Sequence, residues 1–354
     1  MQNSIIQKAA AQYGTGEIQV ESLGEGLIHR TYKVRFIPSN KIIVLQCINQ
    51  HTFPQPENII RNYREIYNYL QLLHPGRIFI PALLLTMHGK LFWIDETENF
   101  WRATEFIADS YSPAISKNEK EGFLAAKCFA QFTKQLSGLD TDLLTEIIPG
   151  FHDLGLRYRQ FEDAVSKGHI KRLLRGTHLI AELRQRIKLV SFYEMMKSSP
   201  EFKLRVMHHD CKISNILFDT QIDQPICPVD LDTTMPGYYF SDVGDMIRTM
   251  ACTVDENDTG WEKIDVKKSL YQAIIEGYDE GIEDAFTKTE KKYIHHAGLL
   301  MIYMQSLRFL TDYLNNDIYY QTSYPEQNLN RALNQFILLE RLEEFLVKEY
   351  SYLI

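Results

Sequence analysis

The stretch VMHHDCKISNILFD (residues 206–219) places two histidines, an aspartate, a lysine and an asparagine between two apolar runs. The flanking runs RVMHH and NILF are too short for two helices and are apolar enough for two buried strands, which predicts a tight loop at residues 210–215. A third strand-like run, ICPVDLD, places Asp230 20 residues after Asp210. The sequence therefore predicts a polar loop and a second carboxylate at the end of a further strand.

The side chains of this loop match the needs of phosphoryl transfer from a nucleotide. One carboxylate accepts the proton of the attacking hydroxyl, an amide and a second carboxylate hold Mg²⁺ against the phosphates, and a cation offsets the developing charge. The pattern predicts these roles, in that order, for Asp210, for Asn215 with Asp230, and for Lys212. The alternative is a plain polar β-turn, because Asp, Ser and Asn favour turns.

Length and charge predict two lobes and a small-molecule partner. The chain has 354 residues, 45% of them hydrophobic, and is longer than a single core usually grows. Its formal net charge of -8 argues against nucleic acid as a partner, because such binding depends on clustered Lys and Arg.

The cysteines and the first residues of the chain predict the cellular compartment of the protein. The five cysteines are odd in number and form no C-x-x-C pair, which fits neither a disulfide framework nor a zinc site. The first residues lack the apolar core of a signal peptide, and no run of about 18 apolar residues follows. We therefore expect a soluble, cytoplasmic protein without a membrane partner.

The character of the sequence changes near residue 107. Before it, short runs rich in β-branched and aromatic residues (IQVESL, TYKVRFI, KIIVLQCI, KLFWID and FWRATEFI) predict an antiparallel sheet, interrupted by one helix that begins at Pro56. After it, helical patterns dominate. The sequence predicts an α+β fold with a small sheet lobe over residues 1–107 and a larger, mainly helical lobe over residues 108–354.

The pattern H-x-D-x-K-x-x-N at residues 208–215 resembles the catalytic loop of protein kinases and of the aminoglycoside phosphotransferase and choline kinase superfamily. PVDLDTTMPG supplies an aspartate at the expected place downstream. LGEGLIHRTYKV resembles a glycine hairpin over phosphates, in which Gly24 and Gly26 would let the backbone approach a nucleotide, although ordinary hairpin glycines are the alternative. The resemblance implies a protein-kinase-like bilobal fold, with ATP in the cleft and catalytic and substrate-binding residues on the helical lobe.

A narrower resemblance, to the N-acetylhexosamine 1-kinase subfamily, covers roughly residues 20–340 and rests on stretches such as LLTEIIPGFHDLGLRYRQFEDA, DLDTTMPGYYFSDVGDMIR and LRFLTDYLNNDIYYQTSYPEQNLNRALNQ. It implies transfer of the ATP γ-phosphoryl group to the anomeric hydroxyl of N-acetylglucosamine or N-acetylgalactosamine, which gives sugar 1-phosphate and ADP. Asp210 would then be the base that meets the sugar, with Asn215 and Asp230 as Mg²⁺ ligands. Arg308 and Tyr319 match positions that are expected to face the sugar.

Two positions depart from the wider kinase pattern. The strand that usually supplies a phosphate-binding lysine reads VLQCIN, so neutral Gln46 stands where a cation is expected. Glu65, 19 residues further on, is the natural partner of that position, with Glu57 as a competitor. Without the lysine, more of the charge stabilisation would fall on Mg²⁺ and Lys212. In the glycine hairpin, Leu27 replaces a histidine that is associated with the family.

Several of these side chains also have a structural interpretation. His208 is expected to brace the loop through a backbone hydrogen bond. Asp232 is either a second metal ligand or a hydrogen-bond acceptor. Arg308 and Asp312, four apart on a helix, suit an ordinary ion pair, and Tyr319 suits the core.

Other functions stay open beside the sugar 1-kinase. The chain could phosphorylate another sugar or an amino alcohol within the same superfamily. A metal-dependent phosphohydrolase would use His208, His209 and Asp210 as metal ligands. Such a site normally carries these residues on helices, whereas the sequence predicts strands beside them. A silent nucleotide-binding module would explain the absent lysine, although it would not need a base at Asp210.

Overall fold

The computed structural model describes residues 2–23 and 28–352, which form two compact units. The first contains Met1–Ser112, Gly138–Ile148 and Leu217–Met235, and the second contains Pro113–Ser137, Pro149–Ile216 and Pro236–Ile354. The chain thus returns twice to the first unit after leaving it. The boundary expected after residue 107 stays a prediction.

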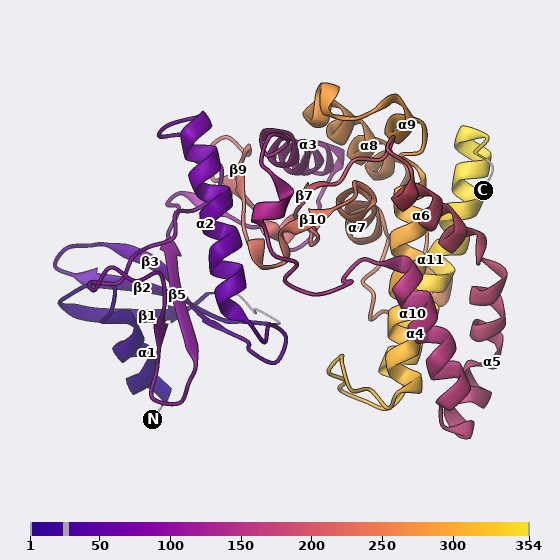
Figure 1. Ribbon diagram of the computed structural model, residues 1–354, viewed down its shortest axis with the longest axis horizontal. Coiled ribbons are helices and arrows are strands. Elements are labelled where there is room, and N and C mark those ends of the chain that lie inside the picture. The colour runs from indigo at the N-terminus through magenta and orange to yellow at the C-terminus, as the bar shows by residue number, and fades with distance from the viewer. Residues whose placement is uncertain (1, 24–27, 353–354) are drawn as a thin grey trace. The chain divides into compact units, whose positions relative to one another are not determined.

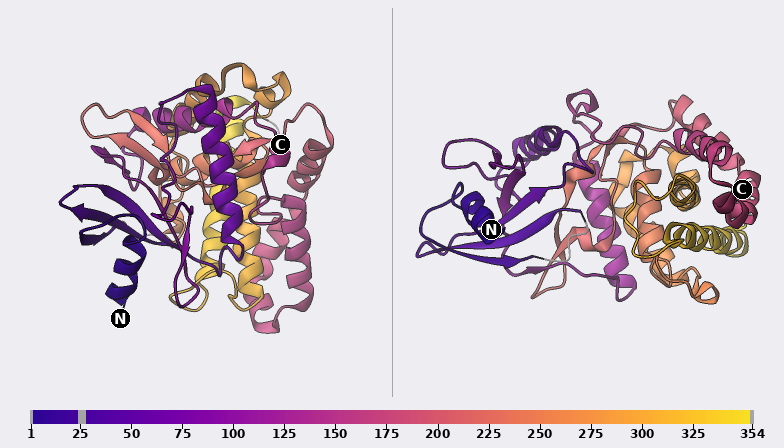
Figure 2. Two further views of the ribbon diagram at one scale, coloured as in Figure 1. Left: turned by 60° about the vertical axis from the view of Figure 1, so that its left-hand side comes forward. Right: turned by 90° about the horizontal axis from the view of Figure 1, so that it is seen from below.

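The first unit is built on a five-stranded antiparallel sheet in the order β1-β2-β3-β5-β4. Its strands are β1 (Glu17–Ser22), β2 (Arg30–Ile37), β3 (Ile42–Ile48), β4 (Trp93–Ile94) and β5 (Phe100–Glu105). Because side chains alternate along a strand, Ile43, Leu45, Trp101 and Ala103 share one face and are fully buried. Helix α1 (Gln2–Ala10) packs on that face (Figure 2).

Helix α2 (Pro56–Leu73) and two later segments complete the first unit. Proline at the start of α2 suits the first helical turn. The later segments carry the 3₁₀ turn η1 (Thr141–Leu143), strands β8 (Ile216–Asp219) and β9 (Pro225–Pro228), which form a small sheet with β6 (Ser110–Tyr111), and the 3₁₀ turn η3 (Leu231–Thr233).

One buried amide ties α2 to both later segments. Asn62 Nδ2 donates to the carbonyl oxygens of Thr145 (2.8 Å) and Thr234 (3.1 Å), and Asn62 Oδ1 accepts the N–H of Thr145 (2.9 Å). An asparagine amide offers donors and an acceptor at once, so this side chain satisfies backbone groups from two distant parts of the sequence.

The second unit is mainly helical (Figure 1). Its helices are α3 (Glu119–Gln135), α4 (Leu154–Lys167), α5 (Ile170–Gln185), α6 (Lys188–Ser198), α7 (Phe240–Met250), α8 (Lys268–Ile282), α9 (Lys288–Lys292), α10 (His296–Leu314) and α11 (Gln327–Tyr350). Short 3₁₀ turns are η2 (Ile213–Asn215), η4 (Trp261–Lys263) and η5 (Glu283–Ala285), and strand β7 (Arg205–Met207) pairs with β10 (Met235–Gly237).

Helix α10 is the centre of this helical unit. It is buried along almost its whole length and packs against α4, α7 and α11, as expected for a helix that is apolar on every side. Helices α3 and α8 also pack closely, because α8 offers a bare backbone at Gly277, where a Cβ would lie 2.2 Å from the carbonyl oxygen of Phe123.

The predicted fold class is confirmed: an antiparallel-sheet unit and a mainly helical unit. The runs expected as strands around the quoted loop are strands β7, β8 and β9, although each is only three or four residues long. The helix expected from Pro56 runs to Leu73. No helix within the described residues is both long and apolar enough to cross a membrane.

Replacing Asn62 with Ala removes three hydrogen bonds and leaves buried backbone groups of Thr145 and Thr234 without this partner. We expect the free energy of unfolding to fall by about 3 kcal/mol, measured by urea denaturation. Asn68→Ala, at an exposed position of the same helix, is the matched control and should change it by about 0.5 kcal/mol or less. Equal effects of the two substitutions would contradict this role for Asn62.

Candidate active site

The backbone of the polar loop between β7 and η2 is hydrogen-bonded to carboxylates in the first turns of α7. The Asp242 carboxylate accepts the backbone N–H groups of His208 (3.1 Å) and His209 (2.8 Å). One turn further along, Asp245 Oδ2 accepts the N–H of Cys211 (2.8 Å). Residues three apart lie on one face of a helix, so α7 presents two carboxylates to consecutive parts of the loop. The loop backbone is thereby fixed at three N–H groups by carboxylates of α7.

Three of the predicted catalytic and metal-binding side chains lie together on this loop. Asp210 Oδ2 accepts a hydrogen bond from Asn215 Nδ2 (2.9 Å) and pairs with Lys212 Nζ at 3.2 Å. Asn215 Nδ2 also donates to the carbonyl oxygen of Asp210 at 2.9 Å. Since the amide nitrogen is used in this way, Oδ1 is the atom of Asn215 that suits a cation.

The charges around Asp210 keep its carboxyl group ionised. Burial opposes ionisation, but nearby Lys212 and His208, together with hydrogen bonds from Lys212 and Asn215, outweigh it, so the pKa of Asp210 lies below its ordinary value. For Asp245 the balance is reversed, because burial and the negative charge of Asp210 raise its pKa despite Arg248. At neutral pH Asp210 is therefore ready to accept a proton.

The two histidines of the loop have supporting environments. His208 is fully buried, and its ring lies edge-on to those of Phe129 and Phe132. His209 has a positive φ of 68°, and its Nδ1 and that of His152 both lie within hydrogen-bond distance of Ser241 Oγ. Burial, and then the proximity of His209, hold the pKa of His152 well below its ordinary value. His208 Nδ1 also accepts the backbone N–H of Asp210 (3.4 Å), so the backbone hydrogen bond expected of His208 is confirmed.

A second cluster of ionisable groups lies in the first unit, around η3. The Asp232 carboxylate pairs through Oδ1 with Arg102 Nη1 (2.6 Å) and through Oδ2 with His29 Nε2 (2.7 Å). His29 Nδ1 accepts the N–H of Asn49 (3.0 Å), so Nε2 is the ring nitrogen that carries a proton. Burial opposes ionisation of Asp232, but Arg102 and then His29 lower its pKa to about 2.

This cluster decides between the two interpretations of Asp232. Possible ligand atoms of His29, Asp230 and Asp232 all lie within 4.8 Å of one another. However, both oxygens of Asp232 already receive donors, and a protonated Nε2 does not bind a metal. The hard-oxygen donor that best fits Mg²⁺ here is the carboxylate of Asp230, which begins η3 in the left-handed conformation (φ 59°, ψ 58°). Asp232 is the hydrogen-bond acceptor that shapes the turn.

Gln46 lies opposite Arg102 in the sheet and binds it. Gln46 Oε1 accepts from Arg102 Nε (3.0 Å) and Nη2 (2.8 Å), while Gln46 Nε2 donates to Thr31 Oγ1 (3.2 Å). Burial opposes the charge of Arg102, but Asp232 outweighs it and raises the pKa of the guanidinium. Sequence reasoning missed Arg102, although one arginine inside the apolar run FWRATEFI was a usable signal of a buried ion pair.

The structure gives fewer contacts for the other residues that were predicted to bind the nucleotide. Glu65 lies on α2 and pairs with its neighbour Arg64 at 3.3 Å, whereas the hydrogen bonds of Gln46 go to Thr31 and Arg102. The structure therefore does not join Gln46 to Glu65. Gly24, Gly26 and Leu27 lie outside the described residues.

Arg308, on α10, and Tyr319, in the loop that follows α10, were predicted to face the sugar and lie near each other. The guanidinium carbon of Arg308 lies 4.9 Å from the ring centre of Phe151, 5.6 Å from that of Tyr320 and 5.9 Å from that of Tyr319. Arg308 is 9% exposed and Tyr319 is 53% exposed. Arg308 is therefore packed among aromatic rings, and Tyr319 is accessible.

The ion pair considered for Arg308 and Asp312 is replaced by other contacts. Asp312 accepts the backbone N–H groups of Tyr319 (2.8 Å) and Tyr320 (2.9 Å) and a hydrogen bond from Asn328 (3.0 Å), while Arg308 Nη1 donates to Gln305 (2.8 Å). Asp312 thus shapes the loop after α10.

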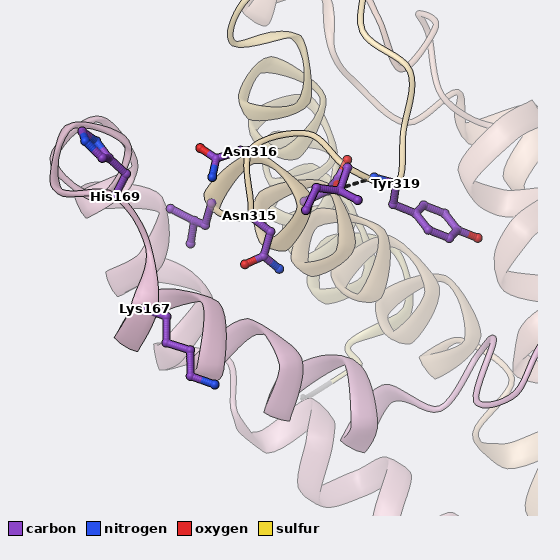
Figure 3. Close-up of a pocket in the computed structure, with 8 residues that line it drawn as sticks. Lys167, His169, Asn315, Asn316 and Tyr319 are labelled. Atoms are coloured by element: carbon purple, nitrogen blue, oxygen red, sulfur yellow. Dashed lines mark hydrogen bonds between the residues drawn. The ribbon is translucent and has the colours of Figure 1, made fainter. Parts of the chain in front are cut away.

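A surface pocket of about 580 Å³ lies between the end of α4 and the loop that follows α10 (Figure 3). It is lined by Lys167, His169, Asp312, Leu314, Asn315, Asn316, Ile318 and Tyr319. The ring of Tyr319 points away from Lys167 and His169. None of the residues of the polar loop lines this pocket, and of the residues predicted to face the substrate only Tyr319 does.

Comparisons with known proteins show the family and the fold of the chain. The model of the phosphotransferase enzyme family (APH) matches residues 21–280. Among solved structures, the chain resembles a microcompartment-associated aminopropanol kinase (16% identity, 98% of each chain covered, TM-score 0.65). It also resembles an aminoglycoside phosphotransferase from Alicyclobacillus acidocaldarius (16% identity, 97% of this chain and 94% of that chain covered, TM-score 0.62). A third likeness is spectinomycin phosphotransferase in complex with ADP and spectinomycin (14% identity, 96% and 93% covered, TM-score 0.55). At such identities these structures show a shared, protein-kinase-like fold.

Replacing Asp242 with Asn should destabilise the loop, because an amide has one acceptor oxygen and would turn an N–H donor toward a backbone N–H. We expect a loss of about 3 kcal/mol in the free energy of unfolding, measured by denaturant titration. Asp279→Asn removes an exposed carboxylate that pairs with Lys291, and this control should cost about 1 kcal/mol at most. An unchanged stability of the Asp242 variant would refute the anchoring role.

Proposed function

The chain belongs to the phosphotransferase enzyme family, and from this premise we propose that it is an ATP-dependent kinase of a small molecule. The acceptor that we propose is the anomeric hydroxyl of an N-acetylhexosamine, and the products are the sugar 1-phosphate and ADP. The observation that carries the kinase proposal is the ionised Asp210 carboxylate, which Lys212 and Asn215 hold on a rigid loop. The narrower choice of acceptor is supported by the resemblance of residues 20–340 to the N-acetylhexosamine 1-kinases.

In this proposal Asp210 orients the acceptor hydroxyl and takes its proton. The oxygen then forms a bond to the γ-phosphorus as the bond to the departing ADP oxygen breaks, in line and on the opposite side. A carboxylate with a lowered pKa is a weak base. Its main contribution is therefore to position the hydroxyl in a fixed electrostatic environment.

In the same proposal, Mg²⁺ and Lys212 offset the negative charge of the phosphates. Asn215 and Asp230 would hold Mg²⁺, which when bound neutralises negative charge on the phosphates. Lys212 would offset the charge that develops during transfer. Gly24, Gly26, Gln46 and Glu65 are proposed for the nucleotide side of the site, within an N-terminal lobe of residues 1–107, and the substrate side falls within residues 108–354.

A neutral acceptor suits the second unit better than a cationic one. Arg308 lies close enough to Arg157 that burial and then the charge of Arg308 lower the pKa of Arg157 to about 10. Arg308 and the exposed ring of Tyr319 offer a guanidinium donor and an apolar face, which suit the oxygens and ring of a sugar, whereas the donors of Arg157 are used by Phe151 and Gln160. An amino alcohol or an aminoglycoside is a cation, for which two neighbouring arginines are unfavourable, while the carboxylates of Asp153 and Asp312 lie in the same region. The two arginines support the neutral acceptor that we propose.

The thiols support the cytoplasmic, reducing location that we propose. All five cysteines are free, and four of them, including Cys211 beside Asp210, are buried. Burial raises the pKa of the Cys211 thiol well above its ordinary value, so this group does not supply a thiolate nucleophile.

A panel of acceptors with ATP and Mg²⁺ tests the proposed function. The panel contains N-acetylglucosamine, N-acetylgalactosamine, glucose, choline, ethanolamine and an aminoglycoside, and phosphorus NMR identifies the product. We expect sugar 1-phosphate from an N-acetylhexosamine and no product from the cationic acceptors. Asp210→Asn should lower kcat by a factor of about 10³ while ATP affinity stays within about threefold. Phosphorylation of choline or an aminoglycoside alone would overturn the choice of acceptor.

Replacing Lys212 with Met should shift the pH dependence of kcat. Activity requires ionised Asp210 and is lost as the pH falls through its pKa, which Lys212 holds down. Without this cation the pKa rises, so we expect the acidic limb of the profile to move to higher pH and kcat at the plateau to fall by about tenfold. Lys203→Met, at an exposed position nearby in the sequence, should leave the limb in place. An unmoved limb in the Lys212 variant would mean that another group titrates.

A further inference from the structure

Three polar side chains form a line across the sheet of the first unit. Thr31 on β2, Gln46 on β3 and Arg102 on β5 are directly opposite one another in the antiparallel register. Paired residues on neighbouring strands point to the same face, so their side chains meet. Gln46 is the middle member, and it receives two N–H groups from Arg102 and gives one to Thr31.

The line continues from Arg102 into the turn that carries Asp230. Arg102 Nη1 pairs with Asp232 Oδ1 at 2.6 Å, and His29 holds the other oxygen of Asp232 at 2.7 Å. Arg102 is 2% exposed and Asp232 is 1% exposed. The pair is therefore shielded from water, and breaking it would leave a buried charge without its partner.

A lysine at position 46 would be incompatible with this arrangement. Lysine has donors and no acceptor, so it would leave the Nε and Nη2 groups of Arg102 without this partner. Its ammonium group would also stand beside a guanidinium in a buried place, where like charges repel strongly. The neutral residue at the usual lysine position is thus required by the buried arginine on the neighbouring strand.

We propose that Gln46 is a positioning residue: it locks Arg102 onto Asp232 and so fixes the η3 turn that presents Asp230. Its contribution to nucleotide and metal binding is made through this chain of contacts rather than by touching a phosphate. The inference rests on the proposed function to the extent that Asp230 is a Mg²⁺ ligand there.

Two substitutions at position 46 separate this role from direct phosphate binding. In Gln46→Glu, the carboxylate still accepts two N–H groups from Arg102, and the Thr31 hydroxyl can turn to donate. We expect a thermal midpoint near that of the wild type and an affinity for MgADP within about threefold. In Gln46→Lys, we expect a midpoint lower by several degrees and an affinity for MgADP lower by at least tenfold. A residue that touched phosphate would produce the reverse order, because Lys would strengthen and Glu would weaken the binding of ADP.

The measurements are calorimetric titration with MgADP, the same titration with ADP in EDTA, and thermal denaturation of the protein without ligands. The loss in Gln46→Lys should be larger with MgADP than with ADP alone, because the metal-binding turn is what moves. Gln7→Lys, at an exposed position of α1 in the same unit, is the control and should match the wild type. If Gln46→Lys does not fold, Gln46→Met carries the test, since it also lacks the acceptor and adds no charge.

The outcomes distinguish the two proposals. The order Glu above Lys in both stability and MgADP affinity supports the positioning role, and the reverse order, or equal values, overturns it. Wild-type protein that binds no MgADP would contradict the proposed function. The order of the thermal midpoints of the Gln46 variants would still test whether Gln46 holds Arg102. No acceptor substrate is needed for any of these readings.

Discussion

The carboxylate of Asp242 accepts the backbone N–H groups of His208 and His209, and the polar loop that carries Asp210 depends on that contact. The two backbone donors would otherwise be buried without this partner, next to the turn in which Asn215 meets Asp210. Because α7 packs against α10, the most buried helix of the second unit, the core of that unit sets the position of the loop. The packing of α7 against α10, away from Asp210, therefore keeps the loop rigid.

The same principle operates in the first unit with different partners. Asp232 pairs with Arg102 and His29, and Asp242 accepts hydrogen bonds from two backbone amides. In each unit, one carboxylate therefore holds a turn in place. A neighbouring carboxylate, Asp230 or Asp210, then has a defined position for chemistry. Losing either partner of the buried pair between Arg102 and Asp232 would leave an uncompensated charge, which makes this pair a sensitive point of the fold.

The charge distribution also limits the chemistry. The phosphate-binding lysine of kinases is absent, and the nearest cation in the sheet, Arg102, is neutralised by Asp232. In the function that we propose, compensation of the phosphate charge would fall on Mg²⁺ and Lys212. In the second unit, burial and then the charge of Arg308 lower the pKa of Arg157.

Much of the fold and the polar loop could be predicted from sequence, because strand alternation, helical spacing and the pattern from His208 to Asn215 are local properties of the chain. The contacts of Gln46 could not be predicted in this way. Arg102, Asp232 and His29 are far apart in the sequence, and only strand register and the return of residues 217–235 to the first unit bring them together. The sequence by itself determined which charged and polar residues gather on the polar loop, because they are close together in the chain. The tertiary structure decided which charges neutralise one another, because that depends on distances between segments that no local pattern encodes.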